Sequence, residues 1–370
     1  MKERTLTLLE DMLRIHSPSR HEHQMTEYLV KYLNNIGARV YLHENQVQYG
    51  GDSPVIFAEI LGTLDAPPVT LNAHTDVIEP NAELNIIKDG NQWRTDGTTT
   101  LGGDDKAGLA AILGAIDYLK RHAIPHRTFY LVITPGEEQG MLGARHTNWE
   151  EVDAEMTLPK NMIVFDNAGR ADRVAYQAPC SYHFEVTIHG RKAHAGIEPE
   201  AGISAIQLAS QIISELPLLR IDADTTANIS TIQSDFPTNV VPDRCTFTGE
   251  VRTQSQERAD QILAQYESII QQQVGDSKHY DFKATLDYPA LRSKDGGAFV
   301  QEVIEAYQAI GVQAKPQIIG GGSDANFFAA HGFNAAIVGV GMQQVHTTEE
   351  YLEIDQLLLT TEMLVHYLTQ

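Results

Sequence analysis

The segment "LVITPGEEQG", residues 131–140, is an apolar run that ends in a Pro-Gly turn and two adjacent glutamates, Glu137 and Glu138. A short continuous apolar run is typical of a strand that is buried on both faces. Neighbouring side chains of an extended chain point to opposite sides, so the two carboxylates can serve two different tasks. The ordinary interpretation of such a pair is a solvated surface turn. Motifs elsewhere in the chain must decide between a functional pair of carboxylates and a surface turn.

Two further apolar runs end in polar residues in the same way: "VTLNAHTD" at 69–76 and "NMIVFD" at 161–166. The carboxyl ends of parallel strands meet at one edge of a sheet, where ligands bind. Helix-like and strand-like segments alternate, which predicts an α/β layered sheet with helices on both faces. The expected helices are 4–16, 21–35 and 105–121, and the expected strands are 38–44, 55–62, 69–76, 127–134 and 161–166.

The order of the predicted helices and strands changes between residues 175 and 288. The expected elements there are strands 182–189, 221–233, 244–252 and 279–287 and helices 201–215 and 255–273. Their order is β-α-β-β-α-β, a split βαβ arrangement that can fold by itself. Helical and strand-like segments alternate again afterwards. We therefore predict one domain formed by 1–174 and 289–370, with a second domain inserted at 175–288.

Composition restricts the partners. The chain has 370 residues, of which 42% are hydrophobic and 21% charged, and its net charge is −22. Such a length favours two domains, and such a charge disfavours nucleic acid and anionic membrane as partners. The N-terminal "MKERTLTLLEDMLRIHS" alternates charges with leucines, without an apolar run of membrane-spanning length, so we expect a cytoplasmic protein. The two cysteines, Cys180 and Cys245, provide neither a disulfide framework nor a Cys-type zinc site.

Two motifs carry candidate metal ligands. "NAHTDV" places His74 and Asp76 on one face of a strand end, where a carboxylate can orient a ligating imidazole. "TLGGDDKAGLAAIL" places Asp104 and Asp105 after a glycine pair and before a helix. A structural histidine and an acidic helix N-cap are the alternative interpretations. The sequence is not a phosphate-binding loop, because the final Lys-Ser/Thr is missing.

Two imidazoles and three carboxylates follow one another at predicted strand ends or in adjoining loops. They are His74, Asp104, Glu138, Asp166 and His346. This donor set suits Zn²⁺, or Co²⁺ or Mn²⁺. Three carboxylates and a hydroxide balance the charge of two divalent cations, so the set favours a two-metal site.

These motifs resemble the M20 family of co-catalytic metallopeptidases, and specifically its peptidase T-like branch. The resemblance covers nearly the whole chain, through "HTD", "GGDDKAG", "PGEEQG", "FDNAG", "GRKAHAGIEPEAGISAI", "NVVPDR", "GGGSDANFF" and "HTTEEYLEI". It implies a zinc-peptidase-like α/β/α catalytic domain with an inserted ferredoxin-like βαββαβ lid domain. The family commonly holds two zinc ions, which cobalt or manganese often replaces.

The resemblance also implies a role for each residue. One metal would be held by His74 and Asp166, and the other by Glu138 and His346. Asp104 would bridge the two metals. In addition, Asp76 would orient His74, and Glu137 would be the general base and acid. The M42 aminopeptidases have similar motifs, but their extra domain is inserted between the histidine and the bridging aspartate, where this chain has only about thirty residues.

Further residues match positions in the family's lid, which often also forms a dimer contact. His194 in "KAHAG" would stabilise the oxyanion, often from the partner subunit; an exposed loop histidine is the alternative. Asn239 and Arg252 would contact substrate, although a structural ion pair is as good an interpretation of Arg252. Gly321 and Gly322 would bring backbone N–H groups to the substrate, or form a strand-to-helix turn.

We therefore expect hydrolysis of peptide bonds in short peptides, with a tripeptide aminopeptidase as the favoured activity. Aspartate at position 166 resembles amino- and dipeptidases of the family, whereas glutamate is commoner in its carboxypeptidases and acylases. An M20 carboxypeptidase or dipeptidase, or an N-acyl amino-acid amidohydrolase, is the main alternative. A non-catalytic binding protein is a remote one, because every catalytic position is filled. A homodimer through the lid is a further expectation.

Overall fold

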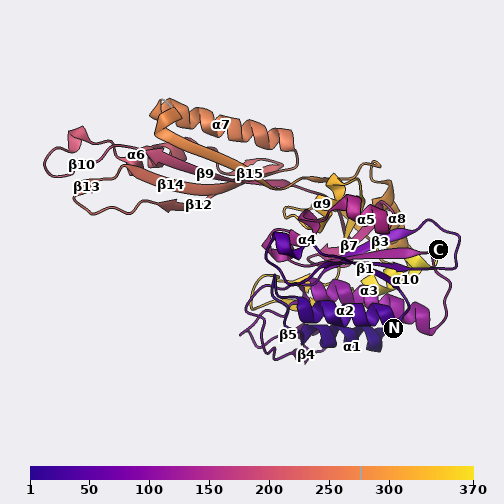
Figure 1. The fold of residues 1–370 in the computed structure, drawn as a ribbon. Coiled ribbons are helices and arrows are strands. Elements are labelled where there is room, and N and C mark those ends of the chain that lie inside the picture. The colour runs from indigo at the N-terminus through magenta and orange to yellow at the C-terminus, as the bar shows by residue number, and fades with distance from the viewer. Residues whose placement is uncertain (276) are drawn as a thin grey trace. The chain divides into compact units, whose positions relative to one another are not determined.

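The computed structural model describes residues 1–275 and 277–370, and these fall into two units (Figure 1). The first unit consists of Met1–Gln177, Leu291–Ile319 and Ser323–Gln370. The second consists of Ala178–Ala290 and Gly320–Gly322. No helix among the described residues is long and apolar enough to cross a membrane.

A nine-stranded mixed sheet forms the centre of the first unit. Its strands are β1 (Arg39–His43), β2 (Val55–Ile60), β3 (Val69–His74), β6 (Phe129–Thr134), β7 (Asn161–Asn167), β8 (Arg173–Ala178), β16 (Leu291–Arg292), β17 (Lys315–Ile318) and β18 (Asn334–Gly339). They follow the order β1-β2-β6-β3-β7-β18-β8-β16, and β17 pairs with β8. The central strands β6, β3, β7 and β18 are parallel. They are almost entirely buried, which explains their continuous apolar sequences.

Helices cover both faces of this sheet. They are α1 (Lys2–Leu13), α2 (His23–Asn35), α3 (Gly103–Arg121), α4 (Leu142–Arg145), α5 (Trp149–Glu155), α8 (Ala298–Ala309), α9 (Asp324–Ala330) and α10 (Ile354–Leu368). Figure 1 shows α1, α2 and α3 on one face and α5 and α9 on the other. The buried α3 is rich in alanine and glycine, so α1, α10 and the sheet pack closely around it. The predicted α/β/α layers are confirmed.

A small antiparallel sheet in the first unit was not expected from the sequence. It consists of β4 (Ile87–Asp89), β5 (Gln92–Arg94), β19 (Met342–Gln343) and β20 (Tyr351–Glu353), in the order β19-β20-β5-β4. The short β19 and β20 pair antiparallel, and both contact α3. The loop between them carries His346, so this sheet positions that histidine.

The second unit has a five-stranded antiparallel sheet. Its strands are β9 (Cys180–His189), β11 (Leu219–Asp222), β12 (Thr225–Gln233), β14 (Arg244–Thr253) and β15 (Tyr280–Tyr288), in the order β11-β12-β14-β9-β15. Helices α6 (Ala205–Glu215) and α7 (Gln256–Val274) share its apolar core. The predicted single strand 221–233 is a hairpin instead. The Asp224 N–H donates to Asp222 Oδ1 at 3.0 Å, which closes the turn between β11 and β12.

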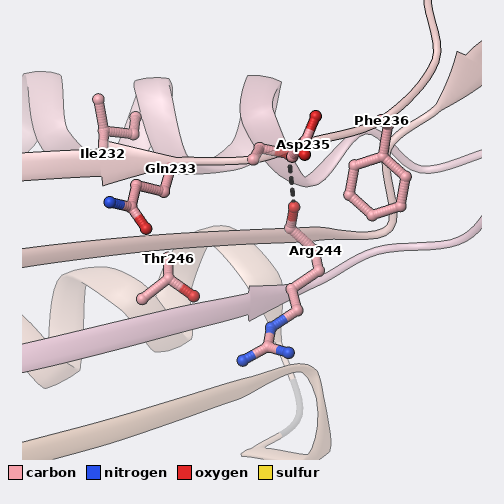
Figure 2. Close-up of a pocket in the computed structure, with 7 residues that line it drawn as sticks. Ile232, Gln233, Asp235, Phe236, Arg244 and Thr246 are labelled. Carbon is pink, nitrogen blue, oxygen red and sulfur yellow. Dashed lines mark hydrogen bonds between the residues drawn. The ribbon is translucent and has the colours of Figure 1, made fainter.

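Shorter elements complete the description. They are β10 (Ala193–His194), which pairs with β13 (Val240–Val241), and the 3-10 turns η1 (Gln46–Gln48), η2 (Glu137–Gln139), η3 (Pro199–Ala201) and η4 (Ser277–His279). An open pocket of about 660 Å³ lies where β12 ends and β14 begins (Figure 2). Its lining includes Ile232, Phe236 and Arg244, and the Ser234 hydroxyl donates to the Arg244 carbonyl at 2.6 Å. None of the site residues predicted from the sequence lines this pocket.

Candidate metal centre

The ends of the parallel strands supply most of the predicted ligands. His74 is the last residue of β3, Asp166 lies near the end of the adjacent β7, and Glu138 lies in the turn that follows β6. Asp104 lies at the start of α3, and His346 lies between β19 and β20. The topology thus brings together side chains from positions 74 to 346, as expected for the carboxyl edge of such a sheet.

The two carboxylate oxygens of Asp104 face two different imidazoles. Asp104 Oδ1 lies 3.2 Å from His74 Nε2, and Asp104 Oδ2 lies 3.4 Å from His346 Nε2. His74 Nε2 also lies 3.8 Å from Asp166 Oδ1, and His346 Nε2 lies 2.9 Å from Glu138 Oε2. The five side chains therefore form two pairs, His74 with Asp166 and His346 with Glu138, with Asp104 between them.

The donor set fits divalent cations. Ligand atoms of His74, Asp104 and Glu138 lie within 4.8 Å of one another. The buried Glu138 Oε1 has no hydrogen-bond partner among the described residues, so its lone pairs remain available. Imidazole nitrogens and carboxylate oxygens are borderline-to-hard ligands that suit zinc, cobalt or manganese.

Electrostatics show how strongly these groups interact. Contacts with Asp104 and Glu138 raise the pKa of His346 to about 10. Burial raises the pKa of Glu138, and Asp104 raises it further, whereas His346 opposes the shift. Burial also opposes ionisation of Asp104, but the two histidines outweigh it and lower its pKa. A cation at this place would replace the protons of the two imidazoles, because ligands bind metal in their deprotonated forms.

Asp105 is a buried neighbour that the sequence interpretation did not assign. It could form a second three-residue group with His74 and Asp166. Its two oxygens, however, already accept backbone N–H groups: Oδ2 from His74 at 3.2 Å and Oδ1 from Gly108 at 3.0 Å. Asp105 therefore joins the end of β3 to the first turn of α3, and Asp104 is left to face the ligand pairs.

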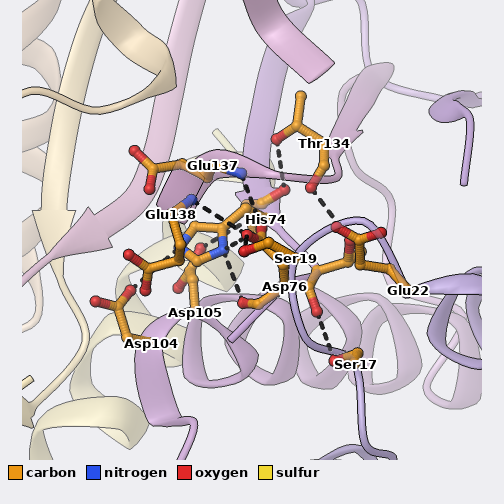
Figure 3. Close-up of polar contacts among 12 residues, drawn as sticks. Ser17, Ser19, Glu22, His74, Asp76, Asp104, Asp105, Thr134, Glu137 and Glu138 are labelled. Atoms are coloured by element: carbon orange, nitrogen blue, oxygen red, sulfur yellow. Dashed lines mark hydrogen bonds and ion pairs between the residues drawn. The ribbon is translucent and has the colours of Figure 1, made fainter. Parts of the chain in front are cut away.

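Asp76 joins the histidine to the turn that carries the two glutamates (Figure 3). Its Oδ1 lies 3.3 Å from His74 Nδ1 and accepts the Glu137 N–H at 2.9 Å, while its Oδ2 accepts the Glu138 N–H at 3.1 Å. The premise of an extended chain at this pair was wrong, because Glu137 and Glu138 lie in the 3-10 turn η2. Successive side chains of such a turn still diverge, by about 120°. The distinct tasks inferred for the two glutamates are therefore compatible with the observed turn.

Two residues near Asp76, Ser19 and Glu22, were not predicted from the sequence, because no motif contains them. The Ser19 hydroxyl donates to Asp76 Oδ2 at 2.6 Å. The buried Glu22 accepts the Arg20 N–H at 2.9 Å through Oε1, and its Oε2 has no partner among the described residues. Both lie in "HSPSRHE", a loop segment without periodicity, and Ser19 is 57 residues from its partner in sequence.

Replacing Glu22 with glutamine is expected to stabilise the protein above neutral pH. Burial raises the pKa of Glu22 to about 8, with a further contribution from Asp76. The folded state therefore keeps a proton that the unfolded chain releases above its ordinary pKa of about 4.5. Stability should fall as pH rises from there to about 8, by up to about 1.4 kcal/mol per pH unit. Thermal unfolding of both proteins between pH 5 and about pH 8 measures this.

The Glu22→Gln variant should have the higher melting temperature at the alkaline end, and the difference should shrink toward pH 5. The exposed Glu362 on α10 offers a control, because Glu362→Gln removes the same charge from a side chain at the surface and gives the baseline for the pH dependence of Glu22→Gln. If the melting temperatures of wild type and Glu22→Gln changed in parallel with pH, Glu22 would not keep a proton in the folded state.

The predicted lid residues all lie in the second unit. His194 is exposed in β10, and its Nδ1 lies 3.2 Å from the Gly196 N–H. The Asn239 carbonyl accepts the Ala195 N–H at 2.9 Å, so Asn239 holds the loop that carries His194. A side chain on Gly321 would meet no atom within 4 Å, so packing does not require glycine there. Gly322 belongs to the same short segment, Gly320–Gly322.

Arg252 makes the ion pair that was the alternative interpretation. Its Nε and Nη2 donate to Glu250 Oε1 and Oε2, both at 3.1 Å, and Nη1 lies 3.5 Å from the Gly320 carbonyl oxygen. The two residues are two apart on β14, so their side chains share one face of the sheet. A substrate carboxylate at Arg252 would have to compete with Glu250.

Family models match two parts of the chain. The model described as peptidase dimerisation domain matches residues 181–278, and the model described as peptidase family M28 matches residues 56–202. The first match lies in the second unit. The second match includes the ends of β3, β6 and β7 and the start of α3.

Three solved structures are similar over the whole chain. Aminopeptidase PepT from Bacillus cereus is 30% identical, with 100% of this chain and 98% of that chain covered and a TM-score of 0.92. A tripeptidase from Staphylococcus aureus is 28% identical, again with 100% of this chain and 98% of that chain covered, and has a TM-score of 0.94. Bacillus subtilis YXEP, a dinuclear metal-binding peptidase of the M20 family, is 18% identical over 100% and 97%, with a TM-score of 0.75. The last shares the fold alone.

Proposed function

Because this chain belongs to the M20 family of metallopeptidases, in its peptidase T-like branch, we propose that it is an aminopeptidase that hydrolyses tripeptides. The observation that carries the proposal is the position of Asp104, whose two oxygens face separate ligand pairs. Such a carboxylate suits a site for two divalent cations, with His74 and Asp166 as ligands of one and Glu138 and His346 as ligands of the other. We propose zinc as the metal, with cobalt or manganese as substitutes.

When bound, two such cations would polarise the scissile carbonyl and lower the pKa of water at the centre. The chain itself would supply the proton transfers. Glu137 takes the proton of the attacking water and delivers it to the leaving amine. Asp76 accepts the backbone N–H of Glu137 and so fixes that residue. The same carboxylate faces Nδ1 of His74 and orients the imidazole.

The electrostatic environment supports Glu137 in this role. Burial raises the pKa of Glu137 well above its ordinary value; nearby His74 opposes the shift, and the carboxylates of Asp324, Glu138 and Asp76 add to it. A higher pKa makes a carboxylate a stronger base toward a proton of water. In the second unit, His194 is proposed to stabilise the oxyanion, and Asn239, Arg252, Gly321 and Gly322 are proposed to bind substrate.

The tripeptide preference rests on two observations. The similar structures with 30% and 28% identity are an aminopeptidase and a tripeptidase. Aspartate at position 166 also resembles the amino- and dipeptidases of the family. Location in the cytoplasm remains a proposal from the sequence. A homodimer through the second unit is supported by the match to a peptidase dimerisation domain.

A panel of substrates tests the proposed polarity and length. Metal-loaded protein should cleave free tripeptides at least about tenfold faster, in kcat/KM, than di- or tetrapeptides of the same residues. N-acetylation should abolish cleavage, because an aminopeptidase site must pair the free amine. The measurement is product release, followed by chromatography. The metal-depleted protein is the control and should be inactive until a divalent cation is restored.

Two outcomes would contradict this function. Cleavage restricted to N-blocked substrates would point to an N-acyl amino-acid amidohydrolase. Cleavage abolished by C-terminal amidation, with N-acetylated peptides still accepted, would point to a carboxypeptidase.

A further inference from the structure

Glu350 is a buried carboxylate in the loop between β19 and β20, four residues after His346. Its side chain points to the turn before α3 rather than to solvent: Oε2 accepts the Gly102 N–H at 2.8 Å, and Oε1 accepts the Asp104 N–H at 3.1 Å. The residue as a whole is only 3% exposed. One carboxylate therefore connects the segment of one candidate ligand, His346, with the segment of the candidate bridge, Asp104.

The turn at Gly102–Asp104 depends on partners from outside α3. Asp104 and Asp105 have non-helical backbone angles, and an N–H at a helix start has no carbonyl of its own helix to bind. Gly102 has a φ of 71°, in the left-handed region that favours glycine. A Cβ on Gly103 would lie 3.1 Å from Glu350 Oε1. The glycine pair thus lets the carboxylate approach the backbone closely.

Hydrogen bonds within the loop that carries Glu350 hold its conformation. The Glu350 N–H donates to the Thr347 carbonyl at 3.2 Å, and the Thr347 hydroxyl donates to the Gln344 carbonyl at 2.7 Å. His346 lies inside this turn with a φ of 66°. A non-glycine residue in that region is strained, and such strain persists only where surrounding contacts hold it.

A buried lysine lies near Glu350. Lys106 is fully buried, and its Nζ donates to the Ile15 carbonyl at 2.6 Å. Glu350 favours the charged form of Lys106, and burial opposes it. Both oxygens of Glu350 are occupied by backbone N–H groups, so it acts as an acceptor for the turn and not as a metal ligand.

We propose that Glu350 is a positioning residue that holds Asp104 midway between the two ligand pairs. The proposal rests on the dinuclear centre inferred above. Asp104 can bridge two cations only if both of its oxygens stay near their imidazoles, now at 3.2 and 3.4 Å. A shift of the turn by about 1 Å would favour one pair over the other. Glu350 prevents that shift because it fixes the Asp104 backbone to the loop of His346.

The test uses Mn²⁺ as the probe on full-length, metal-depleted protein. Two Mn²⁺ ions that share a carboxylate are magnetically coupled, and electron paramagnetic resonance distinguishes them from two isolated ions. Wild type should give the coupled spectrum, and calorimetry should show two binding events. Glu350→Ala should give spectra of isolated ions and bind the second ion about 10–100-fold more weakly.

Conservative variants separate positioning from folding. Glu350→Gln keeps one acceptor oxygen, so its coupling should lie between those of wild type and Glu350→Ala. If Glu350→Ala does not fold, as judged by thermal unfolding, Glu350→Gln alone decides. The adjacent, exposed Glu349 provides the matched control, since Glu349→Gln should keep the wild-type spectrum and both affinities.

Full coupling in a folded Glu350→Ala protein, or in Glu350→Gln where Glu350→Ala does not fold, would overturn the proposal. So would a wild type that binds two Mn²⁺ ions without coupling, or fewer than two. Neither measurement involves peptide turnover. A wild type that shows the coupled pair but cleaves no peptide would therefore refute the proposed function and leave the role of Glu350 intact.

Discussion

The Glu137→Gln variant is expected to keep its metals and lose catalysis, with kcat reduced about 10²–10⁴-fold on a tripeptide. Glutamine has the same shape as glutamate but cannot take a proton from water at neutral pH. Asp76 holds this residue through its backbone N–H, so the turn should not move when the side chain changes. Steady-state kinetics give kcat, and elemental analysis of the same sample gives the metal content.

The neighbouring Glu138 provides the contrast. Glu138→Gln changes the same turn by the same chemical step, but it removes a candidate ligand that lies 2.9 Å from His346. It should therefore lose metal together with activity, whereas Glu137→Gln should lose activity alone. If Glu137→Gln retains kcat within about threefold of wild type, another group carries the proton and the assignment fails.

The sequence predicted the layered fold because its buried strands are continuous apolar runs that end in polar residues. That pattern marks both the strand and the edge of the sheet where its side chains emerge, which is why the sequence predicts His74 and Asp166 at strand ends. The register of β3 against β7, parallel from Thr70 to Asn72, then brings these two ends together.

Other features left no local pattern. The turn at Asp222–Asp224 interrupts the stretch 221–233, which the sequence predicts as one strand; the Asp222 side chain accepts the Asp224 N–H and forms an Asx turn there. The partners behind the ligands are loop residues far from them in sequence. Glu350, for example, is 246 residues from Asp104 in sequence. The two residues meet only because β19 and β20, which flank the loop of Glu350, pack against α3. Arg252 is the converse case: its position resembles a substrate contact of the family, but Glu250, two residues before it on β14, pairs with its guanidinium.

The largest loss of metal is expected from Asp104→Asn. Asparagine keeps the size of the side chain but removes its charge and replaces one oxygen with an NH₂ group, which cannot bind a cation. Since the two oxygens face His74 and His346, neither orientation of the amide can serve both ligand pairs. Dialysed Asp104→Asn protein should hold fewer than about one ion per chain, while His346→Ala should retain about one of two.

Asp105→Asn is the matched control for that loss, because Asp105 also could group with His74 and Asp166. Its oxygens bind the N–H groups of His74 and Gly108, so its replacement should lower the melting temperature and leave both ions in place. Metal content measured by elemental analysis, with thermal unfolding as a check on folding, separates the two aspartates. If Asp105→Asn lost the ions and Asp104→Asn kept them, the bridging role would belong to Asp105, and the paired distances around Asp104 would have no part in metal binding.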